Sequence, residues 1–582
     1  MAHNTCRTKV ENLSVSFRTR LSGLSGRYTN AILLITVLLA VVVTPRSVAT
    51  NSRLSVAPGT MVRLSSVGFL PGQQKEASIA SPCTDFRVVD AKNKTEVLKG
   101  KITGPFRNQD TNEQLYMADF SALKKPGVYR LETSTGQSSV DFRVAADVFR
   151  LPFYAVVRGF YFWRCGTAVS GKHQGITYSH RACHLEDAWL DYVEGAHKRA
   201  TSTGGWHDAG DYNKYVVNAG VTVGTMLLAW EQFQREIENI PLDLPHTTGR
   251  IPDYLNEVKW EMDWLLTMQA ADGSVYHKVS TKGFGPAIQP EEEKTERFFA
   301  PWSSAATADF VAVAFRAARA FKPYDSQYAS RCLDAAKKSF AFLKAHPENH
   351  PADLKEFKTG AYQTNDDDDR LWATAEAWVS TGDPRILLDF ESQARRFSEK
   401  FNADWGWGNV KNLGMLTYLF STLANRNSAV VDEIKAALVA TADAIVQTSK
   451  AHGYRRTLGT TYYWGANGGT ANTAVILQSA NRISPKSEYV TTTLDAIAYL
   501  FGRNYYGRSF VTGVGANPPV NPHDRRSMDQ PGARAWPGYL VGGGWPKAID
   551  WKDESPIYQV NEIAINWNAA LVYALASVLG QQ

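Results

Sequence analysis

The stretch "DVFRLPFYAVVRGFYFWR", Asp147 to Arg164, marks the place where the hydrophobic period of this chain changes. Before it, between Val62 and Val144, short runs such as "VRLSSVGF" and "GVYRLETS" alternate apolar and polar residues, and Gly, Pro, Asn and Asp stand between the runs. This alternation predicts a small β-sandwich. From Asp147 onwards apolar residues recur with the spacing of an α-helix, so we expect a mainly helical domain to follow.

The helical part contains twelve stretches with this spacing. They span residues 147–164, 213–237, 252–270, 304–321, 325–345, 371–381, 384–400, 409–425, 429–450, 468–483, 486–502 and 561–579. Twelve helices joined as consecutive antiparallel pairs close into six hairpins, which predicts an (α/α)6 barrel whose loops at one end build a cleft. Segments 274–305 and 508–561 are long and rich in Gly, Pro and aromatic residues, which is typical of functional loops.

Most of the net charge of +6 lies near the N-terminus. Residues 1–49 hold six basic side chains against Glu11 alone, and the near-neutral remainder argues against nucleic acid as a partner. The cations precede the apolar run Ala31–Val43, after which Ser47 and Ala49 are small residues of the kind that signal peptidases prefer. We therefore expect a cleaved signal peptide and a secreted, extracellular protein. An uncleaved membrane anchor is the alternative, although thirteen apolar residues are fewer than the about 20 that span a bilayer.

Three carboxylates are candidates for chemistry. Asp208 and Asp211 lie in the glycine-rich segment "GGWHDAGDYNKYVVNAG", Gly204–Gly220, and Glu562 begins the apolar stretch "EIAINWNAALVYALA". Inverting hydrolysis of an acetal needs one carboxylic acid to protonate the leaving oxygen and one carboxylate to activate water. Apolar surroundings favour the protonated form of Glu562, because burial disfavours a charge. The alternative is structural, with Asp208 as a helix N-cap and Asp211 and Glu562 as first-turn carboxylates.

The segment 204–220, the motif "FVTGVGANPPVNPHDRRS" (510–527) and the segment 537–576 resemble the three signature regions of the family 9 glycoside hydrolases, the inverting cellulases. The resemblance extends from the β-sandwich through the last helix, and its closest form is the clostridial endoglucanase D type. It implies an immunoglobulin-like β-sandwich ahead of an (α/α)6 barrel. We accordingly expect a signal peptide at 1–49, the immunoglobulin-like domain at 55–146 and the catalytic domain at 147–582.

The family pattern implies that Asp211 is the general base, that Asp208 helps it to hold the water, and that Glu562 is the general acid. The implied activity is that of a secreted endo-β-1,4-glucanase acting on cellulose and related β-glucans, and we expect a monomer. Two alternatives stay open. The first alternative is an exo-acting cellodextrinase or glucosaminidase of the same family. The second is a noncatalytic glycan-binding protein that has kept the barrel.

His523 and Arg525, in "NPHDRRS", match family residues that hydrogen-bond the sugar next to the scissile bond. Alternatively, Arg525 pairs with a structural Asp and His523 has no role. A glucan also needs aromatic planes on which its sugar faces stack. Candidates in the long loops or beside the motifs are Trp302, Trp464, Tyr505, Tyr506, Trp545 and Tyr558. Each of them is equally well a core residue.

Cysteine and histidine residues near the glycine-rich segment form a candidate zinc site. Cys165, Cys183, His184 and His207 are two soft and two borderline ligands, which suit tetrahedral zinc without an open position for chemistry. The resemblance favours a structural zinc that clamps the loop with Asp208 and Asp211, and His197 is a reserve fourth ligand. A disulfide between the two cysteines is the alternative in an exported protein.

A second metal site is expected at "TNDDDDRLW", where hard oxygen ligands of the kind that calcium prefers gather ahead of a helix. The segment resembles the calcium loop of the family, which implies Thr364, Asn365, Asp368, Asp369 and, from the next loop, Asp404 as ligands. One alternative is a solvated acidic helix start. Another is the magnesium-binding aspartate motif of terpene synthases, which is disfavoured because the chain lacks a basic cluster for phosphate.

Overall fold

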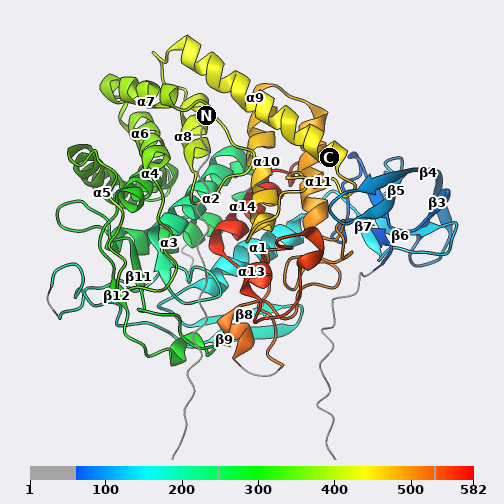
Figure 1. Ribbon diagram of the computed structural model, residues 1–582, viewed down its shortest axis with the longest axis horizontal. Helices are drawn as coiled ribbons and strands as arrows, with labels where there is room; N and C mark the ends of the chain where they lie inside the picture. The colour runs from blue at the N-terminus through cyan, green and yellow to red at the C-terminus, as the bar shows by residue number, and fades with distance from the viewer. Residues whose placement is uncertain (1–59, 196, 246–248, 530–531, 582) are drawn as a thin grey trace, which may run out of the picture. The chain divides into compact units, whose positions relative to one another are not determined.

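The computed structural model describes residues 60–195, 197–245, 249–529 and 532–581, and the predicted signal peptide at 1–49 lies outside them. The described residues belong to one compact unit. It contains a domain of antiparallel strands followed by a domain of packed helices (Figure 1). In the described part of the chain no helix is long and apolar enough to cross a membrane.

Seven strands form the first domain, in the order β1-β2-β5-β4-β3-β6-β7. They are β1 (Val62–Arg63), β2 (Glu76–Ile79), β3 (Asp85–Asp90), β4 (Glu96–Asn108), β5 (Glu113–Asp119), β6 (Gly127–Thr133) and β7 (Phe142–Val144). The long strand β4 pairs with β3 through its first half and with β5 through its second, with a break in register between Thr103 and Phe106. Two layers result, around a core in which Phe69 meets Phe120 and Phe142 edge-on at 5.1 and 5.4 Å. This is the predicted β-sandwich.

Each of the twelve predicted helices is present, with ends shifted by a few residues. They are α1 (Arg150–Trp163), α2 (Val216–Ile237), α3 (Asp253–Thr267), α4 (Ser304–Phe321), α5 (Ser326–Ala345), α6 (Asp367–Thr381), α7 (Pro384–Arg396), α8 (Lys411–Phe420), α9 (Ser428–Ala451), α10 (Ala466–Ile483), α11 (Ser487–Leu500) and α14 (Ile565–Ala576). The short helices α12 (Arg525–Met528) and α13 (Tyr558–Asn561) lie in the segment 508–561, for which the sequence predicts only a loop.

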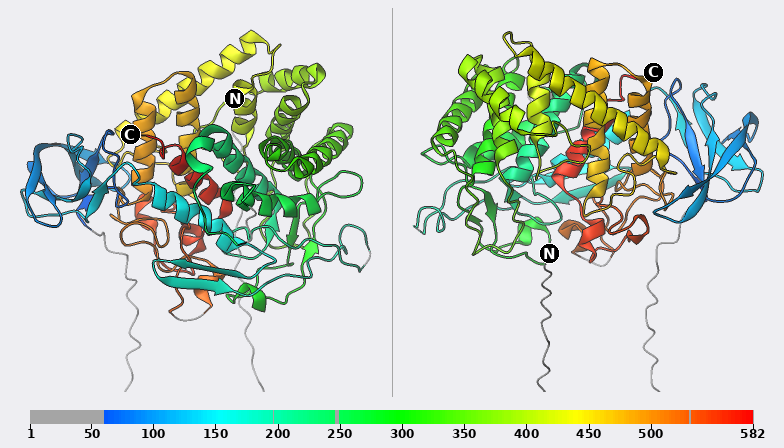
Figure 2. Two further views of the ribbon diagram at one scale, coloured as in Figure 1. Left: turned by 180° about the vertical axis from the view of Figure 1, so that it is seen from behind. Right: turned by 45° about the horizontal axis from the view of Figure 1, so that its top comes forward.

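The helices form an inner and an outer layer. In the inner layer α2 contacts α4, α4 contacts α6, and α6 contacts α8, while α10 contacts α14 and α14 contacts α2. The outer layer consists of α3, α5, α7, α9, α11 and α1. In the left view of Figure 2, α1, α14 and α2 lie side by side. Inner helices such as α14 are buried on nearly every face, whereas α7 buries one stripe containing Leu387 and Phe390. This arrangement confirms the predicted (α/α)6 barrel.

Short strands hold the loops at one end of the barrel. Strand β10 (Lys214–Tyr215) pairs with β11 (Lys278–Ser280), which pairs with β12 (Phe298–Phe299), and β8 (Val169–His173) forms a hairpin with β9 (Ile176–His180). Two of these strands come from the segment 274–305, which is therefore more ordered than a loop. Since β10 runs directly into α2, the small sheet fixes the entry of the glycine-rich segment into the barrel.

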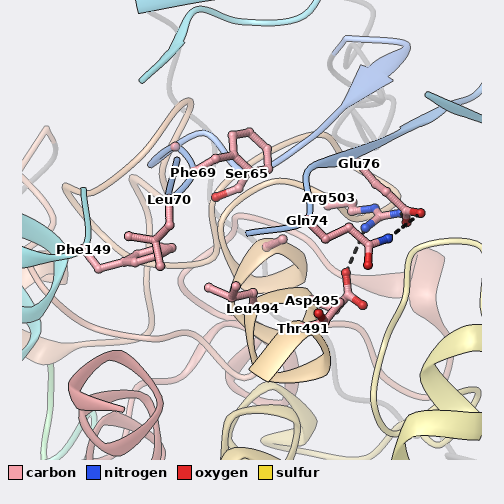
Figure 3. Close-up of a pocket in the computed structure, with 12 residues that line it drawn as sticks. Ser65, Phe69, Leu70, Gln74, Glu76, Phe149, Thr491, Leu494, Asp495 and Arg503 are labelled. Atoms are coloured by element: carbon pink, nitrogen blue, oxygen red, sulfur yellow. Dashed lines mark hydrogen bonds and ion pairs between the residues drawn. The ribbon is translucent and has the colours of Figure 1, made fainter. Parts of the chain in front are cut away.

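Buried ion pairs join the β-sandwich to the barrel. Figure 3 shows Arg503, after α11, between Glu76 of β2 and Asp495 of α11, with nitrogen–oxygen distances of 2.8 and 3.0 Å. Burial favours the neutral form of Glu76, but Arg503 and Arg455 outweigh it and lower the pKa of Glu76 to about 2. The carboxylate is thus charged at neutral pH, and the two domains meet through paired charges.

Candidate active site

The glycine-rich loop 204–211 is held from two sides. Gly205 has a φ of 73°, which glycine adopts without strain, and a Cβ there would come within 2.8 Å of the Trp264 ring of α3. The Trp206 N–H donates to Glu261 Oε2 of α3 at 2.5 Å. These contacts press the loop against α3, so the two aspartates that follow are presented by a well-supported backbone.

Asp208 is 2% exposed and receives a hydrogen bond on each oxygen. Asn218 Nδ2 donates to Oδ1 and the Tyr362 hydroxyl to Oδ2, both at 2.7 Å. Burial and the nearby charge of Asp211 raise the pKa of Asp208 to about 8. The capping alternative is wrong, because the N-cap of α2 is Tyr215 and no side chain caps that helix.

Asp211 is also buried, but its hydrogen bonds differ. Asn213 Nδ2 and the Tyr215 hydroxyl both donate to the same oxygen, Oδ2, at 2.6 and 3.0 Å. The first turn of α2 begins at Val216, so Asp211 is not a first-turn carboxylate. Asp211 therefore lies before the helix, among polar side chains.

Glu562 lies between α13 and α14, in extended backbone with φ −71° and ψ 158°, so the prediction that it begins a helix is wrong. Its segment is tied to the other motifs: Glu562 bridges to His523 in parallel β fashion, and the Ile565 N–H donates to the Asp208 carbonyl at 2.9 Å. Burial, followed by the charges of Asp211 and Asp208, raises the pKa of Glu562 well above its ordinary range.

The three carboxylates line one cavity of about 300 Å³. Asp208 and Asp211 come from the loop before α2, and Glu562 comes from a segment more than 300 positions further along the chain. The walls are largely aromatic and include Tyr215, Phe284, Tyr362, Trp407, Trp464 and Trp567. Carboxyl groups surrounded by aromatic planes suit an uncharged ligand that carries hydroxyls.

The structure places both polar substrate candidates beside the glycine-rich loop. The Arg525 N–H donates to the Gly210 carbonyl at 3.1 Å, and the Arg525 Nε and Nη2 both donate to the Gly285 carbonyl at 3.2 Å. The alternative pairing of Arg525 with a structural Asp is not present among the described contacts. His523 Nδ1 lies 2.7 Å from the Ser555 carbonyl, and burial lowers the pKa of His523, which favours a neutral ring.

Two of the aromatic candidates are well placed to meet a ligand. Trp464 lines the cavity and is 45% exposed, and Tyr558, 41% exposed, lies 5.1 Å from it between ring centroids. Large aromatic side chains that remain so exposed in a folded protein are unusual unless they contact something. They therefore stay candidates for stacking.

Trp302, Tyr505 and Tyr506 do not line the cavity. Trp302 stacks on His350 at 3.8 Å, and the Arg63 guanidinium lies over the Tyr505 ring at 5.3 Å. Tyr506 is 2% exposed, so the prediction that it stacks on substrate is wrong. A neighbouring protein group thus occupies one face of the Trp302 ring and one face of the Tyr505 ring. Trp545 is partly exposed but also lies outside the lining.

Five aromatic residues of the cavity wall were not among the predicted stacking residues, namely Tyr215, Phe284, Tyr362, Trp407 and Trp567. Phe284 and Trp407 share a signal that could have found them, because each stands between two glycines, in "GFG" and "GWG". Glycines on both sides leave an aromatic ring free to project from a loop. Tyr362 carries no comparable sequence signal, and its φ of 44° becomes visible only in the structure.

The predicted zinc ligands come together. Donor atoms of Cys165, Cys183, His184 and His207 all lie within 4.8 Å of one another, with Cys165 Sγ 3.5 Å from His184 Nδ1 and Cys183 Sγ 3.8 Å from His207 Nε2. Bonds of about 2.0 to 2.3 Å meeting at tetrahedral angles around zinc require donors at about this spacing. Both cysteines are free thiols, so the disulfide alternative is wrong.

The surroundings of the cluster fit a metal as well. His184 Nε2 lies 3.1 Å from Glu293 Oε2, the kind of outer carboxylate that orients a ligating imidazole. The Cys165 N–H donates to the Gly205 carbonyl at 2.7 Å, which connects the cluster to the glycine-rich loop. His197 is not part of it, since its side chain is 64% exposed and stacks on Trp189, so the reserve-ligand prediction is wrong.

The predicted calcium ligands do not form one group. Asp369 is fully buried and faces Asp309 of α4, and apart from the hydrogen bond between these two carboxyls no described donor reaches their oxygens. Asp368 instead accepts a hydrogen bond from the Val410 N–H, and Asp404 accepts one from the Tyr463 hydroxyl. Because Asp368 and Asp369 occupy the first turn of α6, they point to different neighbours. The structure does not bring the Asp369 carboxyl to the other predicted ligands, and its role as a calcium ligand stays a prediction.

Thr364 and Asn365 lie ahead of the helix. The Thr364 hydroxyl lies 3.3 Å from the Gly408 carbonyl, and Asn365 Oδ1 accepts from the Asp367 N–H at 3.0 Å. The acidic segment thus contacts the loop 404–410, as the predicted ligand set requires, while its carboxylates diverge.

The sequence matches two known protein families over the segments that build this site and the β-sandwich. Residues 150–575 match the Glycosyl hydrolase family 9, and residues 57–138 match the Cellulase N-terminal ig-like domain. The chain belongs to glycosyl hydrolase family 9. The match covers the barrel with all three carboxylates, and the second match covers most of the β-sandwich. The predicted family, fold class and glycoside hydrolase activity are confirmed.

Relatives of this family 9 member resemble it over most of its length. It is 55% identical over 518 residues to Endoglucanase D of Acetivibrio thermocellus, covering 88% of this chain and 83% of the relative. It is 32% identical over 556 residues to a Cellodextrinase of Butyrivibrio fibrisolvens, covering 89% and 99%. The crystal structure of a metagenome-derived glycoside hydrolase family 9 endoglucanase superposes with a TM-score of 0.84 at 31% identity, covering 90% and 99%.

Proposed function

We propose that this family 9 hydrolase is an endo-β-1,4-glucanase that cleaves cellulose and related β-glucans with inversion, in the cavity lined by Asp208, Asp211 and Glu562. The observation that carries the proposal is this convergence of three carboxylates from two distant segments on one aromatic cavity. Its similarity to Endoglucanase D supports the endo-acting assignment over the exo-acting one. Intact carboxylates argue against a noncatalytic glycan-binding protein.

In this mechanism Glu562 is the general acid. Burial and the two nearby aspartates keep the proton on its carboxyl, so it can protonate the glycosidic oxygen. Asp211 is the general base that deprotonates the attacking water, and Asp208 helps to hold that water. Attack on the face opposite the leaving oxygen inverts the anomeric carbon.

The glucan lies against the aromatic wall. Trp464 and Tyr558 offer exposed faces on which sugar rings would stack. Arg525 and His523 would hydrogen-bond hydroxyls next to the scissile bond, and the contact of Arg525 with the glycine-rich loop supports this role.

The anomer of the first product tests the mechanism. Cellohexaose is incubated with the enzyme and new reducing ends are followed by proton NMR before mutarotation, and we expect α-anomers from the β-linked substrate. Fresh β-anomers would contradict inversion. In parallel, the viscosity of carboxymethyl cellulose should fall early relative to the release of reducing sugar. A proportional fall would instead favour the exo-acting alternative.

We also propose that Cys165, Cys183, His184 and His207 hold a structural zinc ion. The bound ion would fix the geometry of four buried ligands and leave no position for catalysis. Its role would be mechanical, because His207 directly precedes Asp208 and the Cys165 N–H is bonded to the same loop.

For calcium we propose a reduced site, in which Thr364, Asn365 and Asp368 act with the loop that carries Asp404. Asp369 is left out because its carboxyl faces the core. Hard oxygen donors at the start of α6 and the contact with the loop 404–410 support this placement.

We further propose that residues 1–49 are a cleaved secretion signal, that residues 55–146 are the immunoglobulin-like domain, and that residues 147–582 form the catalytic domain of a monomer. The order of cations, apolar run and small residues supports the signal. N-terminal sequencing of the exported protein tests it, and a start upstream of the apolar run would contradict it.

A further inference from the structure

We propose that Tyr215 is a positioning residue for hydrolysis: with Asn213 it holds Asp211 by Oδ2 and thereby leaves Oδ1 as the oxygen that takes the proton from water. This inference rests on the proposed role of Asp211 as the base.

The hydrogen bonds of Asp211 are one-sided. Asn213 Nδ2 and the Tyr215 hydroxyl reach Oδ2 at 2.6 and 3.0 Å, and no described residue donates to Oδ1. Asp211 lines the cavity. Its free oxygen is therefore the one available to a water molecule, and the two donors prevent the carboxylate from rotating it away.

Asp208 provides the contrast within the same loop. Its two donors, Asn218 and Tyr362, reach different oxygens, so that each oxygen of Asp208 is engaged by the protein. When the protein donates hydrogen bonds to both oxygens of a carboxyl, that carboxyl serves mainly to position other groups. When the protein donates to only one oxygen, the other oxygen is available to exchange a proton with water. The pattern assigns the base to Asp211 independently of the family resemblance.

A second hydrogen bond, from Gly360, determines the direction in which the Tyr215 hydroxyl donates. The Gly360 N–H donates to the Tyr215 hydroxyl oxygen at 3.2 Å, so the tyrosine accepts there and directs its own proton to Asp211. Burial, followed by the charges of Asp211 and Asp208, raises the pKa of Tyr215 well above its ordinary range. The hydroxyl therefore remains a donor over the working pH range of the enzyme.

Gly360 is itself fixed in place. Lys278, which stands opposite Tyr215 in the pairing of β10 and β11, donates from Nζ to the Gly360 carbonyl at 2.8 Å and to Thr359 Oγ1 at 2.9 Å. A Cβ at Gly360 would lie 3.1 Å from both the Tyr215 and Tyr362 rings. The absence of a side chain at 360 thus lets the backbone approach both tyrosines that hold the aspartates.

The variant Tyr215→Phe tests the inference. A hydrogen bond to the charged form of a carboxylate lowers its pKa, so its loss should move the acidic limb of the kcat/KM profile upward by about one pH unit. We expect kcat on cellohexaose to fall about tenfold, less than the about 10²- to 10⁴-fold that loss of the base itself would cost, with KM within twofold of wild type. Unchanged kcat and acidic limb in the folded variant would overturn the inference, as would a loss of kcat without a shift of the limb.

Tyr254→Phe is the matched control. Tyr254 is a buried tyrosine of α3 whose hydroxyl donates to the Met226 carbonyl at 3.0 Å, remote from the cavity lining. Its variant loses a comparable hydrogen bond and should change the melting temperature without moving the pH profile. An equal shift in both variants would show a general structural effect and would contradict the positioning role.

Gly360→Ala provides a second measurement if Tyr215→Phe does not fold. The added methyl should displace the Tyr215 ring and shift the acidic limb in the same direction, and an unmoved limb would count against the inference. Asp211→Asn separates the two proposals. If Asp211→Asn remains active, the proposed function itself fails, whereas an inactive Asp211→Asn beside a fully normal Tyr215→Phe overturns only the role of Tyr215.

Discussion

The glycine-rich loop 204–211 and the acidic segment 364–369 are alike in sequence and unlike in structure. Both place aspartates at or just before the start of a barrel helix. In the loop, Asp208 and Asp211 accept hydrogen bonds from amide and tyrosine side chains and line a cavity. In the segment, Asp369 is buried against Asp309, and apart from the hydrogen bond between them no described donor reaches either carboxyl.

The backbone explains the difference. The loop 204–211 is irregular, so residues three apart can present their carboxyls to one cavity. The acidic segment enters α6 at Asp367, and successive residues of a helix point about 100° apart. Asp368 therefore turns toward the Val410 N–H while Asp369 turns into the core. Neighbouring aspartates form a site only where the backbone lets them converge.

The largest difference between the two regions is expected in turnover when one carboxyl of each is replaced by an amide. Asp211→Asn removes the proposed base, and we expect turnover on cellohexaose to fall by about 10³-fold or more with the fold retained. Asp369→Asn, which changes the same group in the acidic segment, should keep turnover within about threefold. Comparable losses in both variants would mean that the acidic segment also takes part in the chemistry.

The zinc cluster should support the loop and not the acidic segment. In Cys183→Ser we expect zinc content to fall below one half per chain and the melting temperature to drop by about 5 to 10 °C, because the ion stabilises only the folded ligand set. Cys332→Ser, at a buried free cysteine of α5, is the control and should retain full zinc. Metal analysis and calorimetry decide, and a zinc-replete Cys183→Ser would remove Cys183 from the site.

The smallest effect is expected from the buried pair of the acidic segment. Burial raises the pKa of Asp369 and Asp309 well above the ordinary value, so their contribution to stability is present at low pH and is lost as pH rises toward the folded-state pKa. Asp369→Asn cannot ionise. We therefore expect its melting temperature to exceed that of wild type by about 2 °C at pH 8, with a smaller difference at pH 5.

The exposed Asp367 on the same helical turn provides the comparison, and Asp367→Asn should show no such gain at pH 8. A melting temperature of Asp369→Asn that falls equally at both pH values would indicate lost packing and not the removal of a buried ionisable group.

Much of this protein was predictable because its signals are local. Twelve helical periods predict twelve helices, and the alternation between Val62 and Val144 predicts the sandwich. The motif around Asp208 and Asp211 predicts the cleft through its resemblance to a family. The Cys and His spacing predicts a cluster whose donor atoms do converge. In each case the pattern is repeated along the chain or is highly specific, so the prediction does not depend on how individual side chains pack.

The errors share a different cause. Glu562 is expected in a helix but lies in extended backbone, because it bridges to His523. Tyr506 is expected in the cleft but is core, since its hydroxyl is bonded to the Trp551 carbonyl. Phe284, Tyr362 and Trp407 are missed because they approach the cavity from three separate loops.

The sequence by itself determined which segments are helix and strand, and which residue types are available for acid–base chemistry and for a metal. The reason is that periodicity and side-chain chemistry are properties of neighbouring residues. Only the tertiary structure decided the state of each carboxyl: Asp208 is hydrogen-bonded at both oxygens, Asp211 at one, and Asp369 only to the carboxyl of Asp309. Burial and hydrogen-bond partners set the proton affinity of a carboxyl, and burial, like the hydrogen bond from Tyr362 to Asp208, depends on distant parts of the chain.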